Sequence, residues 1–115
     1  ERCRKRFDAV LEDVFIGTGR DAVKPDWLPQ PGLARAKARL ARYGVLASNA
    51  LDEAPAVSAA MGDLFPGVVR IEVEEYDNQI FVGCSRGLTG RELRRAVAAT
   101  PILAPTLPQL SFRSL

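Results

Sequence analysis

Residues 68–85 read VVRIEVEEYDNQIFVGCS, and this stretch decides how the rest of the chain is expected to fold. Val69, Ile71 and Val73 alternate with charged side chains, which is the pattern of a strand with one buried face. A tight turn over 76–79 leads into a second strand that ends at Cys84. The stretch predicts a β-hairpin, with its register set by Arg70 opposite acidic residues or by neighbouring strands.

Upstream of the hairpin, apolar residues at helical spacing predict one helix over 1–14 and a second over 33–43. Gly44 is placed to stop the second helix. Between the helices, 17–32 is rich in glycine and proline and is expected to be a loop. Trp27 lies in that loop, and we expect it to be buried and to hold the loop on the core.

Two more helices are expected on either side of the hairpin. The third covers 52–64, with Pro55 tolerated in its first turn because the missing N–H is not needed there. The fourth begins at a capping box, in which the Thr89 hydroxyl accepts from a helical N–H and the Glu92 carboxylate accepts from the cap N–H. Pro101 ends it.

After the last helix, the tail over 101–115 contains Pro105 and Pro108 and is expected to be extended, and its apolar side chains indicate that it docks on this domain or on a partner. Two strands alone form a marginal sheet, so a third is expected from 15–16, from 44–46 or from the tail. The predicted fold is α+β, with about four helices and a small antiparallel sheet built around the 68–85 hairpin.

Composition limits the function classes. The 115 residues contain no histidine and two cysteines, which excludes histidine-based triads within this chain. The net charge of +2 is too small to indicate a nucleic-acid partner by itself. No run of 18 apolar residues exists, so no membrane partner is expected. We expect one domain over 1–115, cut from a longer cytoplasmic protein because the chain does not begin with Met, and the abundant Ala, Arg and Val suggest a bacterial source.

One candidate site surrounds Cys84, where a strand runs into a glycine-bearing loop and a capped helix. It resembles the anion-cradling loops of the cysteine phosphatase and rhodanese families, although six residues separate Cys84 from Arg91 where the phosphatase pattern has five. The resemblance implies an oxyanion bound by backbone N–H groups and an arginine, next to a thiol of lowered pKa. The alternative is a buried cysteine at a strand end, free or paired with Cys3. The residues of this candidate thiol loop are Cys84, Ser85, Gly87, Thr89 and Arg91.

A second candidate is a pair of arginine stripes on the second and fourth predicted helices. Two such helices side by side would make a surface for phosphates, with Tyr43 and Tyr76 available to stack on bases. In size and class the chain is similar to small bacterial toxin ribonucleases that work without histidine. The alternative is that these arginines are solvated or paired with acidic residues. The candidate anion-binding residues are Arg35, Arg39, Arg42, Arg91, Arg94 and Arg95.

The leading hypothesis is a non-catalytic protein-interaction or regulatory domain, because no catalytic signature is present and the tail is apolar. Its partner would be another protein or the rest of its own chain. A histidine-independent ribonuclease or RNA-binding domain is the alternative, and thiol or phosphate chemistry at Cys84 is a third hypothesis. No cofactor or metal ion is predicted.

Overall fold

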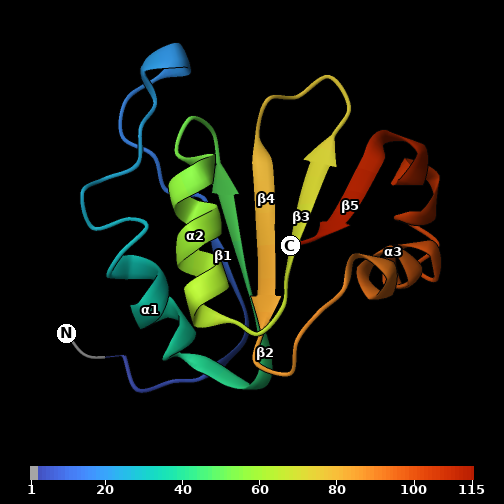
Figure 1. The fold of residues 1–115 in the computed structure, drawn as a ribbon, viewed down its shortest axis with the longest axis horizontal. Helices are drawn as coiled ribbons and strands as arrows, with labels where there is room; N and C mark the ends of the chain where they lie inside the picture. The colour runs from blue at the N-terminus through green and yellow to red at the C-terminus, as the bar shows by residue number, and fades with distance from the viewer. Residues whose placement is uncertain (1–2) are drawn as a thin grey trace.

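The computed structural model describes residues 3–115, which form a five-stranded mixed sheet flanked by helices (Figure 1). The elements in chain order are β1 (Phe7–Glu12), the 3₁₀ helix η1 (Gly19–Asp21), α1 (Gly32–Lys37), β2 (Leu40–Ala50), α2 (Ala54–Leu64), β3 (Val68–Val73), β4 (Gln79–Cys84), α3 (Gly90–Ala98), the 3₁₀ helix η2 (Ala104–Gln109) and β5 (Leu110–Ser114).

The strand order is β1-β2-β4-β3-β5, which leaves β1 and β5 at the two edges. The α+β class is confirmed. The expected small antiparallel sheet is confirmed only in part, because β2, β4, β3 and β5 pair antiparallel but β1 pairs with β2 in parallel. The long crossover through the loop and α1 makes this pairing possible, since parallel neighbours need a connection that returns along the sheet.

The predicted hairpin is confirmed as β3 and β4, with Val69 opposite Val82 and Ile71 opposite Ile80. Arg70 does not set the register through acidic residues, because it lies opposite Phe81 on one side and Arg113 on the other. The apolar cross-strand pairs and the two flanking strands fix the register instead.

The helix predicted over 1–14 is wrong where the structure describes it, because Phe7–Glu12 forms β1; residues 1–2 lie outside the described part. The apolar spacing from Phe7 to Val14 fits a helix, but a short apolar run does not separate helix from strand. The same residues also alternate along a strand, and pairing with β2 satisfies their backbone groups.

The helix predicted over 33–43 is also too long, since α1 ends at Lys37 and β2 begins at Leu40. Gly44 is inside the strand and does not stop a helix. A Cβ atom at this position would lie 2.8 Å from the carbonyl oxygen of Phe7, so glycine permits the close approach of β1. Tyr43, with φ of 142°, belongs to an irregular stretch of β2 where the parallel register shifts.

The later elements agree better with the sequence. Helix α2 has Pro55 in its first turn, and α3 begins with the predicted capping box of Thr89 and Glu92. The tail is only partly extended, because Pro105 and Pro108 lie in η2. Its last residues, Leu110–Ser114, form β5 and pair antiparallel with β3, so the tail supplies a strand to the sheet.

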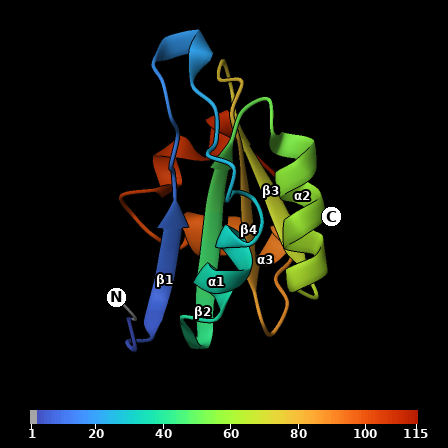
Figure 2. The same ribbon diagram turned by 90° about the vertical axis from the view of Figure 1, so that its left-hand side faces the viewer.

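Helices α1 and α2 cover one face of the sheet, as the nearly edge-on view shows (Figure 2). The core lies between them, and its fully buried residues include Leu33, Leu46, Met61 and Phe81. The other face is covered only in part, since α3 packs on β5, η2 and β3.

Trp27 is not the buried residue that holds the 17–32 loop on the core, because 50% of its surface is exposed. Leu28, the next residue, is buried in the core and takes that role.

Candidate functional site

Alternation along β1 and β2 sends neighbouring residues to opposite faces of the sheet. Glu12 and Ser48 point towards the helices, whereas Leu11 and Ala47 point to the other face. The two faces differ in chemistry as well as in covering.

The covered side contains a buried ion pair between Glu12 and Lys24. The Lys24 Nζ atom lies 2.9 Å from Glu12 Oε1, and only 1% of the Lys24 side chain is exposed. The Ser48 hydroxyl donates to Glu12 Oε2 at 2.5 Å, and the Val14 amide donates to Oε1 at 2.8 Å. Phe15 lies over the ammonium, 4.2 Å from ring centre to Nζ. The charges are therefore paired and hydrogen-bonded, as buried charges must be.

Glu53 links this cluster to the start of α2, because its Oε1 accepts from the Lys24 amide at 3.0 Å. Burial acts to raise the pKa of Glu53, but hydrogen bonds from the amide of Lys24 and from nearby backbone groups outweigh it and lower the pKa below its usual value. The contacts tie the 15–31 loop to β1, β2 and α2. Ser48 is fully buried, so the cluster is a structural element with no access for a substrate.

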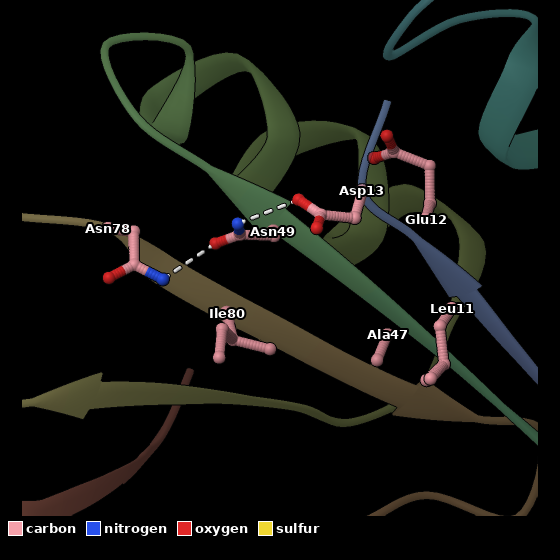
Figure 3. Close-up of a pocket in the computed structure, with 7 residues that line it drawn as sticks. All are labelled: Leu11, Glu12, Asp13, Ala47, Asn49, Asn78 and Ile80. Atoms are coloured by element: carbon pink, nitrogen blue, oxygen red, sulfur yellow. Dashed lines mark hydrogen bonds between the residues drawn. The ribbon is translucent and has the colours of Figure 1, made fainter. Parts of the chain in front are cut away.

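The opposite side of the same strands carries a shallow groove of about 230 Å³ (Figure 3). Its floor is apolar and consists of Leu11, Ala47 and Ile80, from three adjacent strands. Leu11 has 79% of its surface exposed. The volume is below the range of roughly 300–1,000 Å³ that is typical of small-molecule pockets. We call the surface formed by Leu11, Asp13, Ala47, Asn49, Asn78 and Ile80 the open face.

A ladder of polar side chains borders the groove (Figure 3). Asn49 donates from Nδ2 to Asp13 Oδ1 at 2.9 Å, and Asn78 donates from Nδ2 to Asn49 Oδ1 at 2.8 Å. Glu12 points away from the groove, towards its partner on the covered side. The ladder orients the Asp13 carboxylate, which is exposed and carries the negative charge of this rim.

The open face continues to the free edge of the sheet at β1. Beyond β2, no strand pairs with β1 among residues 3–115. Phe7 shares the side of Leu11 by alternation, and 40% of its surface is exposed. This edge therefore combines unpaired backbone groups with exposed apolar side chains.

The arginine residues predicted to bind anions do not lie on two neighbouring helices. Arg35 is exposed on α1, Arg39 precedes β2 and Arg42 is exposed within β2, with its guanidinium 5.2 Å from the Tyr43 ring centre. The other group, Arg91, Arg94 and Arg95, is exposed on α3. Figure 1 shows α1 and α3 on opposite sides of the molecule.

At the predicted thiol loop, Cys84 is buried and both cysteines are free. The Cys84 thiol lies 3.1 Å from the carbonyl oxygen of Gly87, to which it donates. Gly87, with φ of +82°, makes the turn after β4, and Ser85 is exposed on that turn. Thr89 caps α3, and Arg91 is exposed in the first turn of that helix. Because the Cys84 sulfur is buried, this loop presents no accessible nucleophile.

The sequence does not predict the open face, because its apolar spacing favours a helix over 1–14 and its candidate strand before α2 ends at residue 46. The signal was present as alternation in two places. Ala9, Leu11 and Asp13 occupy every second position along β1 and just after it. Ala47 and Asn49 do the same in β2, so the residues of each set lie on one face of the sheet.

Over residues 3–115, no helix is both long and apolar enough to span a membrane. The same residues contain no group of three or more Cys, Asp or Glu side chains placed to hold a metal ion. Comparison with protein-family models, with curated proteins and with solved structures found no match.

Proposed function

We propose that this chain is a non-catalytic protein-interaction domain, which binds an extended segment of a partner along β1 and over the open face. The observation that carries the proposal is Leu11, a large apolar side chain with 79% of its surface exposed on a strand whose outer edge is unpaired. Folding gains nothing from an apolar side chain in this position, whereas a partner strand would bury it.

The edge has the features that allow strand addition. An unpaired strand presents a row of N–H and C=O groups, and proteins normally protect such edges with charges, proline or a covering segment. Here β1 reads FDAVLE, with Phe7, Ala9 and Leu11 on the open side. A partner strand would satisfy the backbone and place its own side chains beside these three.

The chemistry of the partner follows from the groove. Its apolar floor selects aliphatic or aromatic side chains, and the exposed Asp13 carboxylate at its rim selects a lysine or arginine. We therefore expect a partner segment in which apolar residues alternate along a strand and a basic residue follows at one end.

RNA binding by the arginine residues is the alternative. Exposed Arg91, Arg94 and Arg95 support it on α3, and the pairing of Arg42 with Tyr43 supports it at the start of β2. The separation of α1 from α3 favours the protein partner, because it leaves Arg35 away from the arginines of α3 and a phosphate-binding surface requires neighbouring cations.

The test is site-specific photo-crosslinking in the cells that produce this protein, with the crosslinker at Leu11, and separately at Arg94 as a matched exposed position on α3. The protein captured at Leu11 is then purified, and its binding to the wild-type chain and to Leu11→Glu is measured by calorimetry. We expect a protein adduct at Leu11 only, and binding that Leu11→Glu weakens by about tenfold or more.

Two outcomes would overturn the proposal. One is an RNA adduct at Arg94 together with cleavage or retardation of total tRNA. That result would mean that the chain acts on RNA through its arginine residues. The other is an equal yield of protein adducts at both positions, which would mean that the open face has no selective partner.

A further inference from the structure

Residues 4–13 read RKRFDAVLED, with basic residues at one end and acidic residues at the other. This segment has the properties that the proposed function requires of its partner: apolar residues that alternate along a strand and a basic end. We infer that the partner is a second copy of this chain, paired antiparallel through β1 about a two-fold axis at Ala9. The inference rests on the proposed function and specifies its partner.

The backbone of β1 is available for this pairing. The Phe7 amide donates to the Arg39 carbonyl at 2.8 Å, on the inner side of the strand. Where the register between β1 and β2 shifts, the additional residues belong to β2. Strand β1 has none, so its successive backbone groups alternate regularly between the two sides of the strand. Alternation then turns the N–H and C=O groups of Asp8 and Val10 outward, where a second strand would bond them.

Charge selects one register among the possible ones. A two-fold axis perpendicular to the sheet keeps each residue on its own face, so paired residues must both be odd-numbered or both be even-numbered. Centring the axis at Asp8 would place Asp8 opposite itself, and centring it at Val10 would place Asp8 opposite Glu12. Both arrangements set acidic residues against each other, which destabilises a strand pair.

Centring the axis at Ala9 removes these conflicts. On the open side, Phe7 of each copy faces Leu11 of the other, and Lys5 faces Asp13. Within β1 the pairs are Phe7–Leu11, Asp8–Val10 and Ala9–Ala9, and continuing the same register past Phe7 adds Arg6–Glu12 and Lys5–Asp13. Lys5, Phe7, Ala9 and Leu11 are all exposed in the single chain, so each is accessible to the second copy. The pairing would join two five-stranded sheets and bring the two open faces side by side.

The opposite edge does not offer the same pairing. Strand β5 reads LSFRS and contains one charged residue, Arg113, with no acidic residue to face it. Its end is also held inward, because the Leu115 amide donates to the Val68 carbonyl at 2.9 Å. The β1 edge is therefore the one that is self-complementary.

The test is sedimentation equilibrium of the purified chain from about 1 µM to about 1 mM, which covers the range of weak to moderate self-association. We expect a reversible monomer–dimer equilibrium. Lys5→Glu and Asp13→Lys should each raise the dimer dissociation constant by about tenfold, because each puts like charges opposite one another in two symmetric pairs. The double variant Lys5→Glu/Asp13→Lys restores opposite charges and should return the constant to near its wild-type value.

Arg94→Glu serves as the control, since it makes the same change of charge on α3 and should leave the dissociation constant unchanged. Circular dichroism verifies that each variant is folded. A chain that stays monomeric to 1 mM, or a dimer that the double variant does not restore, overturns the inference. In that event a selective protein adduct at Leu11 would still support the proposed function with a different partner, so the two failures are distinguishable.

Discussion

The two faces of the sheet are built from the same strands but serve different purposes. On the covered side, Leu46 and Phe81 are 0% and 1% exposed beneath α1 and α2. On the open side, the next residue along β1 from buried Glu12 is Leu11, which remains 79% exposed. The difference indicates that the folding free energy comes mainly from the covered side, and that the open face can be changed with little effect on stability.

The largest effect should follow from removing a side chain in the covered core. Phe81→Ala leaves a cavity at a fully enclosed position and should lower the free energy of unfolding by about 3–5 kcal/mol, as measured by urea denaturation. Leu11→Ala on the other face should change it by less than about 0.5 kcal/mol. Similar losses for both variants would contradict the distinction between the two faces.

The buried ion pair should be nearly as sensitive. Lys24→Met leaves the Glu12 carboxylate without its cation and should cost about 3 kcal/mol in the same assay. The double variant Lys24→Met/Glu12→Leu removes the uncompensated charge and should regain most of that loss. If the double variant is as unstable as the single one, the pair contributes through packing and not through charge.

A smaller effect is expected at the start of α3, the helix on the less covered side. Thr89→Ala removes the cap that accepts from the Glu92 amide, and should cost about 1 kcal/mol. Thr89→Ser keeps a hydroxyl and serves as the matched control. An unchanged unfolding midpoint for Thr89→Ala would mean that the capping box does not contribute to stability.

The pH dependence of that cap gives the smallest effect. The Thr89 amide and hydroxyl donate to Glu92 and lower its pKa below the usual 4.5. A lowered pKa stabilises the fold fully above the unfolded value, and this stabilisation is lost as the pH falls through the folded value. Urea denaturation between about pH 6 and pH 3 should show a smaller loss of stability for Glu92→Gln than for wild type. Identical slopes would exclude this contribution.

The parts of the fold that were predictable from sequence are those determined by local residues. The β3–β4 hairpin and the α3 capping box are local, and the chain shows both patterns directly. Strands β1 and β2 were missed because their pairing joins residues far apart in sequence. Glu12 shows the same limit, since its partners Lys24 and Ser48 are 12 and 36 residues away.

The candidate site was beyond prediction for a related reason. Alternation in β1 identifies two faces, but only the packing of α1 and α2 decides which one is covered. The arginine residues, in contrast, are visible in the sequence, but the sequence does not show that α1 and α3 lie apart or that Arg39 and Arg42 lie outside any helix.

The central claim is that the outer edge of β1 is a contact surface, and residue-resolved amide hydrogen exchange of β1 tests it most directly. The outward amides of Asp8 and Val10 should exchange rapidly at about 10 µM and be protected at about 1 mM, and Leu11→Glu should abolish that protection. The inward amide of Phe7, which donates to Arg39, should be protected at both concentrations. Outward amides that exchange at the same rate at every concentration would contradict pairing through this edge.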